Sequence, residues 1–246
     1  MSKTVYRQEI YTYYLGQSIS SQEFIQSLDL SQYNRQFQAW WGDVLPRDLN
    51  APILDAGCGW GGFLSFLQSK RYTDLTGVDS SPQQVEIAQR LGLQQVEVGD
   101  IFDALHKYTN HYSCIVAFNV LEHLDKDQVL PFLKAAKAAL RPNGCLLLEL
   151  PNANSPFGSR TRYWDFTHEL SFTPTSLFQI FEVVGFSQVQ LRERAPVVHG
   201  FKSLVRSILW QGIRHALGFY LVIEQGNTGY KVFTQDMHAI AVKPDV

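Results

Sequence analysis

A short glycine-rich segment, ILDAGCGWGG at residues 53–62, carries the residue types whose chemistry is easiest to interpret. An apolar run ends in Asp55 and is followed by Gly57, Gly59 and Gly62. The spacing Gly-x-Gly-x-x-Gly is typical of loops that let the backbone approach a nucleotide closely. No Gly-Lys-Ser/Thr follows, which argues against a phosphate-binding P-loop. The segment therefore predicts a nucleotide-type ligand and leaves its identity open.

Two further acids follow apolar, strand-like runs. Asp79 ends the run LTGVD, where a carboxylate can accept both hydroxyls of a ribose. Asp100 and Ile101 follow a third run, beside the place where an adenine would lie. A dinucleotide site needs no acid at this third position, so the pattern disfavours NAD. Simpler interpretations stay open, because Asp79 could cap the helix expected after Ser81 and Asp100 could be a solvated loop acid.

Four segments in order, ILDAGCGWGG, LTGVDSS, VGDIF and FNVLEHL, resemble the motifs of class I S-adenosylmethionine (SAM)-dependent methyltransferases. The resemblance covers residues 50–195 and implies that SAM is the cofactor. It places Asn119 under the sulfonium, and Arg35 could pair with the cofactor carboxylate. The residues predicted to bind SAM are Asp55, Gly57, Gly59, Asp79, Ser80, Asp100, Ile101, Asn119 and Arg35.

The acceptor side is expected in the loop PNANSPFGSRTRYWDFTHELSFTP, residues 151–174, because such loops lie at the carboxyl ends of parallel strands. Methyl transfer to a hydroxyl requires an aligned nucleophile and removal of its proton. We predict His168 as the base, oriented by Asp165 or Glu169, since an imidazole suits proton transfer near neutral pH. Alternatively His168 only holds the loop in place, and Asp165 pairs with an arginine of the same loop.

The same loop offers groups that could bind an acceptor. The run YWDFTHELSFTPTSL resembles methyltransferases found with polysaccharide and lipopolysaccharide assembly enzymes, which implies a sugar hydroxyl as the acceptor. Tyr163 and Trp164 could stack on a sugar ring, or they could be core packing under the loop. His123 could line the pocket or bind the backbone. The residues predicted to bind the acceptor are Arg160, Arg162, Tyr163, Trp164, Glu169 and His123.

Residues 199–223, HGFKSLVRSILWQGIRHALGFYLVI, form an insertion with apolar residues at helical spacing. Three interpretations stay open: a lid over the acceptor, a helix docked on the sheet or on a partner subunit, and peripheral contact with a membrane surface. The last would suit a lipid-linked acceptor.

The remaining chain predicts an α/β, Rossmann-like, doubly wound sheet, because strand-like runs alternate with helical ones. The family resemblance implies seven strands in the order 3-2-1-4-5-7-6, the last antiparallel. We expect a single domain, 1–246, with an N-terminal helical cap (1–48), a SAM-binding core (49–195), a helical insertion (196–228) and the last strand (229–246).

Composition limits the alternatives. The net charge of -2 gives no electrostatic footprint for nucleic acid, and three cysteines suggest reduced thiols in a cytoplasmic protein. No cluster with metal-ligand spacing is evident, so no metal is predicted, and the oligomeric state stays open. The leading hypothesis is a SAM-dependent methyltransferase for a small-molecule, sugar or lipid-linked glycan acceptor. The alternatives are a quinone, lipid or small aromatic acceptor, and a non-catalytic SAM-fold binding module.

Overall fold

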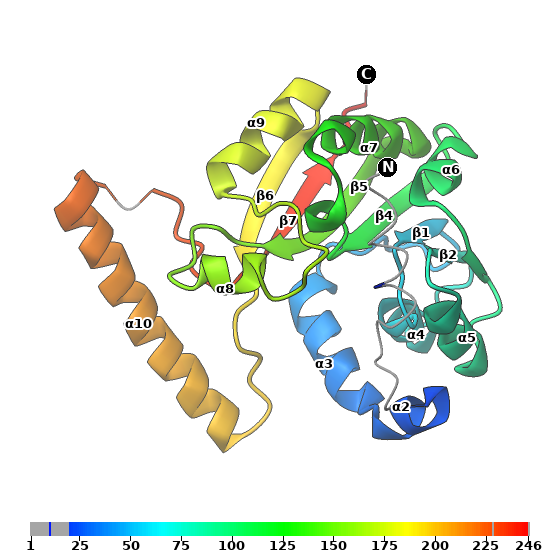
Figure 1. The fold of residues 1–246 in the computed structure, drawn as a ribbon, viewed down its shortest axis with the longest axis horizontal. Helices are drawn as coiled ribbons and strands as arrows, with labels where there is room; N and C mark the ends of the chain where they lie inside the picture. The colour runs from blue at the N-terminus through cyan, green and yellow to red at the C-terminus, as the bar shows by residue number, and fades with distance from the viewer. Residues whose placement is uncertain (1–9, 11–19, 228, 246) are drawn as a thin grey trace.

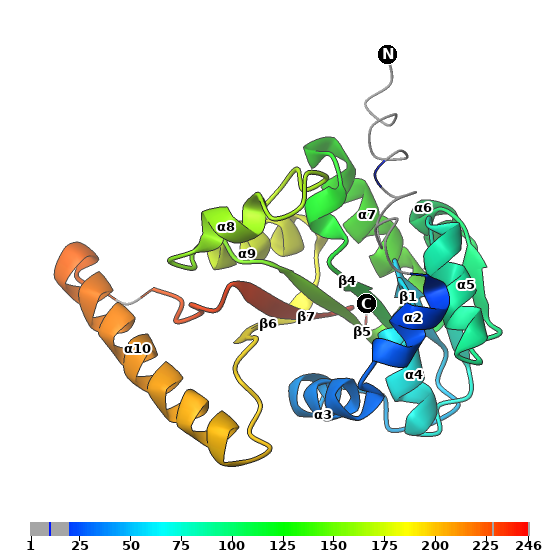
Figure 2. The same cartoon turned by 60° about the horizontal axis from the view of Figure 1, so that its bottom comes forward.

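The computed structural model of the chain describes residue 10 and residues 20–227 and 229–245. Its centre is a seven-stranded sheet in the order β3-β2-β1-β4-β5-β7-β6, with helices on both faces (Figures 1 and 2). β7 runs antiparallel to both of its neighbours, β5 and β6, and the other described strand pairs are parallel, which confirms the expected topology. The strands are β1 (Ile53–Ala56), β2 (Leu75–Asp79), β3 (Val96–Val98), β4 (Tyr112–Phe118), β5 (Leu140–Pro151), β6 (Ser187–Glu193) and β7 (Asp236–Val242).

The helices divide between the two faces of the sheet. Phe132 and Phe181 belong to the apolar cluster under α6, α7 and α9, whereas Trp41 and Phe63 belong to the cluster under α3, α4 and α5. Strands covered on both faces explain why their sequences are almost continuously apolar. The helices are α2 (Ser21–Ser27), α3 (Leu30–Trp41), α4 (Gly62–Ser69), α5 (Pro82–Arg90), α6 (Ile101–His106), η1 (Leu121–His123, a 3-10 helix), α7 (Lys126–Ala139), α8 (Gly158–Arg162), α9 (Pro174–Val184) and α10 (Phe201–Gln225).

One edge of the sheet holds the strand ends at which a ligand site is expected. Because β1 to β6 run in the same direction, their carboxyl ends share this edge. β7 runs the opposite way, so its first residue, Asp236, lies there too. The loops that leave β4, β5 and β6 therefore meet over one edge, as open α/β sheets require of a ligand site.

Helices α2 and α3 hold the glycine segment through aromatic contacts. Ser20 caps α2 and shares a capping box with Glu23, which fixes where the helix begins. The ring of Trp60, inside the glycine segment, lies 6.0 Å from the ring of Phe24 and 5.2 Å from that of Tyr33, centroid to centroid. The N-terminal helices thus pack directly on the predicted cofactor loop.

Two strands have boundaries that the sequence alone does not show. β5 begins at Leu140 and includes the sequence RPNG at 141–144, with the left-handed Asn143 (φ 60°) inside it. β7 begins at Asp236, within the segment 229–246 that was expected to hold the last strand. Just before β7, the side-chain amide of Asn152 donates to the backbone carbonyls of Val232 and Thr234. A side chain, rather than a neighbouring strand, therefore satisfies these two carbonyls.

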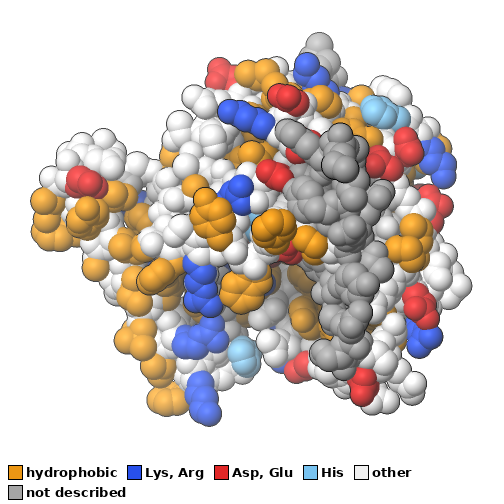
Figure 3. Space-filling view, in the orientation of Figure 1, with side chains coloured by type: hydrophobic (Ala, Val, Ile, Leu, Met, Phe, Trp, Pro, Cys, Tyr) orange, Lys and Arg blue, Asp and Glu red, His pale blue; other side chains and the backbone are white. Residues whose placement is uncertain are grey.

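The helical insertion predicted at 199–223 is confirmed as α10, which projects from the rest of the molecule (Figures 1 and 2). Its buried residues, Ser203 and Gly218, are small, whereas its large apolar residues face outward. Figure 3 shows hydrophobic side chains gathered along this helix, with Lys and Arg side chains beside them. The exposed apolar residues of α10 are Phe201, Leu204, Val205, Ile208, Leu209, Ile213, Phe219, Tyr220, Val222 and Ile223.

Among the described residues, no helix combines the length and apolar character that crossing a bilayer requires. The expected division into cap, core, insertion and last strand stays a prediction. Within the predicted cap, residues 1–9 and 11–19 lie outside the described residues, as do residues 228 and 246.

Candidate active site

The glycine segment forms a tight loop between β1 and α4. Gly57 and Gly59 adopt left-handed backbone angles (φ 83° and 53°), which favour glycine. A Cβ atom added at Gly57 would lie 2.5 Å from Cγ2 of Val120, the residue after Asn119. The loop therefore brings bare backbone against the end of β4, which suits a ligand that lies close to the chain.

Asp79 ties this loop to β2. Its Oδ2 accepts from the backbone N–H of Gly59 at 2.8 Å, and its Oδ1 accepts from that of Ser81 at 2.8 Å. Burial raises the pKa of Asp79, although these two backbone hydrogen bonds act in the opposite direction. Ser81 rather than Asp79 is the N-cap of α5. The predicted ribose-binding acid is thus fixed at the loop, with the exposed Ser80 beside it.

Asp55 is the next-to-last residue of β1 and is buried behind the loop. Burial, with the charge of Asp79 adding to it, raises the pKa of Asp55 to about 8. A carboxyl with this pKa keeps its proton near neutral pH, so Asp55 lies behind the loop as a neutral group.

The predicted adenine residues lie at the start of α6. Asp100 is exposed, and its Oδ1 accepts from the backbone N–H groups of Phe102 (2.7 Å) and Asp103 (3.3 Å). Asp100 is therefore the N-cap of α6 rather than a mere solvated acid. Ile101 is half-buried against the core. The N–H of Gly99, just before α6, donates to the backbone carbonyl of Asp79. The start of α6 therefore lies next to the end of β2.

Two further predicted cofactor residues, Asn119 and Arg35, lie in different parts of the fold. Asn119 is exposed at the end of β4 in a left-handed conformation (φ 54°), at the edge where the sulfonium was expected. Arg35 donates to Oγ of Ser31 within α3. It stands two residues from Tyr33 and from Phe37, which face the glycine loop and α4, so it points away from them. The pairing of Arg35 with the cofactor carboxylate stays a prediction.

The predicted base is held differently from what we expected. Nδ1 of His168 lies 3.0 Å from the carbonyl oxygen of Thr161, which can only accept, so Nδ1 carries the proton. Asp165 accepts through Oδ1 from the backbone N–H and the hydroxyl of Thr167 (2.8 and 2.7 Å). A backbone carbonyl, rather than Asp165 or Glu169, therefore orients the ring of His168.

Asp165 instead orients His123. The Thr167 hydroxyl donates to Asp165, so its oxygen accepts from Nδ1 of His123 at 2.8 Å. The rings of His123 and His168 meet edge to face, 4.7 Å between centroids. The carbonyl of Glu122 accepts from the N–H groups of Glu169 and Leu170, which fastens the loop to the end of β4.

Glu122 lies beside His123 and His168 and has buried carboxylate oxygens without a described partner. It is fully buried, and neither of its carboxylate oxygens has a hydrogen-bond partner among the described residues. Burial raises its pKa well above the usual range, and the charges of Asp236, Glu149 and Asp165 add to that rise. Glu122 and His123 are adjacent in the 3-10 helix η1, and a side-chain oxygen or nitrogen atom of each lies within 4.8 Å of a ring nitrogen of His168.

The acceptor loop presents its aromatic residues to solvent. Tyr163 and Trp164 are 78% and 72% exposed, so they are not core packing. The guanidinium of Arg160 lies 5.4 Å from the ring of Trp164, and that of Arg162 lies 5.1 Å from the ring of Tyr163. Arg162 also donates to the carbonyls of His168 and Glu169, which stabilises the loop.

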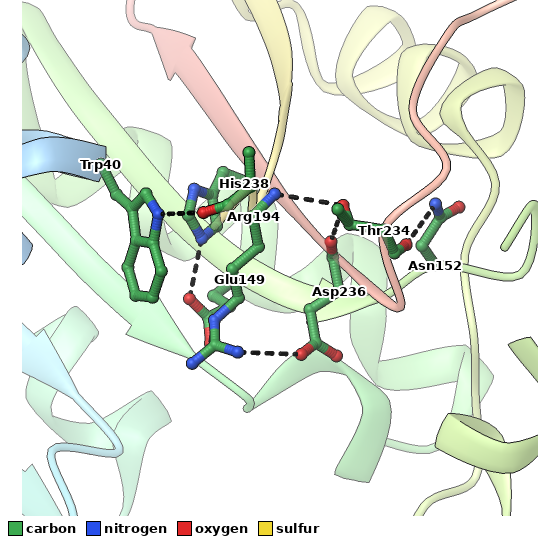
Figure 4. Close-up of polar contacts among 8 residues, drawn as sticks. Trp40, Glu149, Asn152, Arg194, Thr234, Asp236 and His238 are labelled. Atoms are coloured by element: carbon green, nitrogen blue, oxygen red, sulfur yellow. Dashed lines mark hydrogen bonds and ion pairs between the residues drawn. The ribbon is translucent and has the colours of Figure 1, made fainter. Parts of the chain in front are cut away.

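A second polar cluster at the same edge was not predicted (Figure 4). Oε2 of Glu149, in β5, lies 2.8 Å from Nε2 of His238 in β7, and Oε1 lies 3.2 Å from Nε of Arg194. Arg194 also reaches Asp236 at 3.6 Å. Burial alone would raise the pKa of Glu149, but His238, Arg194 and Asn119 together lower it. Sequence patterns could not show this cluster, because the antiparallel pairing of β5 with β7 creates it.

The order of these elements decides the family. A family model described as a methyltransferase domain matches residues 30–191, most of the chain. The chain belongs to this methyltransferase family. SAM is the cofactor of the domain, and the bare glycine backbone and the acids at the strand ends fit a sulfonium nucleoside. For this methyltransferase, Gly57, Gly59, Asp79 and Asn119 stay the residues predicted to hold SAM.

Curated relatives of the methyltransferase share the same part of the chain. Ubiquinone biosynthesis O-methyltransferase of Coxiella burnetii is 28% identical over 158 residues, covering 54% of this chain and 66% of that protein. The protein of the same name from Xanthomonas oryzae pv. oryzae is 30% identical over 107 residues, covering 42% of this chain and 44% of that protein. The chain thus matches just under two thirds of the length of the C. burnetii relative. Neither name supports the expected polysaccharide subgroup.

Solved structures share the fold. A SAM dependent methyltransferase from Archaeoglobus fulgidus superposes with a TM-score of 0.59 at 20% identity, covering 97% of this chain and 100% of that one. A putative methyltransferase from Haloferax volcanii, solved with the Trm112 activator, gives 0.61 at 14% identity, covering 87% and 91%. At these identities the likeness concerns the fold alone.

Proposed function

We propose that this methyltransferase transfers the SAM methyl group to a hydroxyl of a small aromatic or quinone-type acceptor. The observation that carries the proposal is the imidazole of His168 at the carboxyl edge of the sheet, in a loop that also carries exposed aromatic side chains. The names of the curated relatives support an O-directed reaction and a quinone-type acceptor.

The chemistry is an in-line displacement. The acceptor oxygen bonds to the methyl carbon while the carbon–sulfur bond breaks, and the electron pair stays on sulfur in S-adenosylhomocysteine. The hydroxyl proton must leave the oxygen. Because Nδ1 of His168 donates to the Thr161 carbonyl, Nε2 is the nitrogen that can accept that proton. His168 is the proposed base, and Thr161 is the group that orients it.

The rim of the site suits a flat apolar acceptor. Tyr163, Trp164 and Phe166 are all more than two-thirds exposed, at 78%, 72% and 81%. Aromatic side chains stack on a ring with roughly 0.5–1.5 kcal/mol beyond the area they bury. A sugar hydroxyl is the second candidate, favoured by Arg160 and Arg162 over these rings, where they could hold an anionic sugar.

The outer face of α10 supports an acceptor held in a membrane. It combines ten exposed apolar residues with Lys202 and Arg206, and Glu224 is the single acid of this helix. An amphipathic helix of this kind binds the headgroup region by its apolar face and anionic lipids by its cations. We propose peripheral membrane contact through this face, which would bring the enzyme to an apolar acceptor.

The test is methyl transfer from radiolabelled SAM to a short-chain quinol and, separately, to nucleotide sugars and lipid-linked glycans. We expect label in the organic-solvent fraction with the quinol, and a decrease of 10²-fold or more for His168→Gln. Label only in a water-soluble glycan would transfer the proposal to the sugar acceptor. SAM binding without turnover on any acceptor would indicate the non-catalytic module instead.

A further inference from the structure

The group formed by Glu122, His123 and His168 has the composition of a metal site. One potential ligand atom from each of the three residues lies within 4.8 Å of the other two. Two ligands bound at about 2.1 Å can be no more than about 4.2 Å apart, so movements below an ångström would allow all three to bind one ion. The glutamate and the first histidine come from η1, and the second histidine comes from the loop after α8.

The hydrogen bonds around the two histidines are those of metal ligands. Nδ1 of His123 donates to Oγ1 of Thr167, and Nδ1 of His168 donates to the carbonyl of Thr161. Both rings therefore keep the lone pair on Nε2. Ligating histidines usually donate the other ring N–H to an oxygen in this way, which fixes their tautomer and orientation.

Glu122 provides a second, independent observation. Both of its oxygens are buried and lack a hydrogen-bond partner among the described residues, which is costly for a carboxylate. The nearby acids Asp165, Glu149 and Asp236 increase the negative charge around it, while Arg194 is held by Glu149 and Asp236. A bound cation would satisfy both the orphaned oxygens and this local charge.

From this arrangement we infer that Glu122, His123 and His168 bind a first-row divalent transition-metal ion of the Zn²⁺ class. Two imidazoles and one carboxylate suit such an ion, whereas Mg²⁺ prefers oxygen ligands. Three protein ligands leave a position open, as in catalytic zinc sites. The inference rests on the proposed function in one respect: the open position would take the acceptor oxygen. Bound there, the acceptor hydroxyl would lose its proton to water more readily. With the ion bound, Nε2 of His168 would be a ligand, so the base role proposed above for His168 applies to the chain without metal.

The test uses the full chain after dialysis against a chelator. Titration with Zn²⁺ should give one bound ion per chain and a higher melting temperature. Glu122→Gln, His123→Gln and His168→Gln should each weaken Zn²⁺ binding at least tenfold, whereas the matched control His106→Gln, on the exposed end of α6, should not. Mg²⁺ should compete poorly. Co²⁺ in place of Zn²⁺ should give a visible spectrum that changes when the acceptor is added.

The outcomes separate this inference from the proposed function. Zn²⁺ binding that Glu122→Gln leaves unchanged, or no stoichiometric binding at all, would overturn the metal site. SAM affinity measured on each variant shows whether the fold survives. Methyl transfer that persists in chelator but is lost in His168→Gln would support a base without metal. Stoichiometric Zn²⁺ binding with no methyl transfer would retain the metal site and reject the function.

Discussion

At the scale of single residues, the acids predicted to bind SAM already have structural partners. Asp79 accepts two backbone N–H groups, and it stays the predicted ribose acceptor. Asp100 caps α6 at the end of the next strand. Sequence patterns located these acids because each of them follows an apolar strand. They did not show that the Thr161 carbonyl holds His168 or that Asp165 binds Thr167, because residue spacing does not determine how a loop closes.

Asp79→Asn should lower SAM affinity about 10- to 100-fold, because one charge-assisted acceptor for the ribose is lost. The amide keeps the shape of the carboxylate, so the fold should survive. Isothermal titration with SAM measures the change, and circular dichroism checks the fold. Glu97→Gln, an exposed acid on the neighbouring β3, is the matched control and should bind SAM as the unaltered chain does. Equal affinity of both variants would remove Asp79 from the cofactor site.

Asp55 should make stability depend on pH. Its pKa is about 8 in the folded chain, against 3.8 for the ordinary side chain. Between these values the folded state keeps a proton that the unfolded state releases. The free energy of unfolding should therefore fall as pH rises from about 4 to 8.

Asp55→Asn should remove this contribution, so the variant should gain stability relative to the unaltered chain at pH 8 compared with pH 5. Urea denaturation at both pH values, without cofactor, measures the difference. Parallel pH profiles for the two proteins would show that Asp55 does not hold a proton in the folded state.

At the scale of elements, the alternating strand-like and helical runs predicted the doubly wound sheet, and the family resemblance implied the strand order and the antiparallel β7. The Glu149–His238 contact was not, since the residues lie far apart in sequence and only the register of β5 with β7 joins them. The same holds for His123 and His168, which the loop after α8 brings together. α10 was predicted as a helix, but its spacing alone could not show that its apolar face points outward.

Ile208→Ser with Phe219→Ser should reduce binding to vesicles that contain anionic lipid about tenfold or more. The two side chains are 62% and 67% exposed on α10, and burying such groups contributes roughly 1.5–3 kcal/mol each when complete. Co-sedimentation measures the binding. Val183→Ser, 69% exposed on α9, is the matched control. A concentration-dependent dimer in sedimentation, without vesicle binding, would assign the face to a second copy.

At the scale of the whole molecule, cofactor binding and folding are linked. SAM binds the folded chain only, so a hundredfold excess over Kd adds about 2.7 kcal/mol of stability. For a protein of this size the melting temperature should rise roughly 5–10 °C. Differential scanning fluorimetry measures the rise, and NADH should produce none. A rise with NADH instead of SAM would contradict the cofactor assignment.

The contact of Trp60 with Phe24 and Tyr33 has a thermodynamic consequence for the N-terminal helices. Since the cofactor loop and α2 meet through one indole ring, docking of these helices and binding of SAM are coupled equilibria. Coupling is reciprocal: whatever factor SAM adds to helix docking, docking adds to SAM affinity. The fluorescence of Trp60 would report both events. A truncation that removes α2 should lower the affinity for SAM by the factor that docking of this helix contributes.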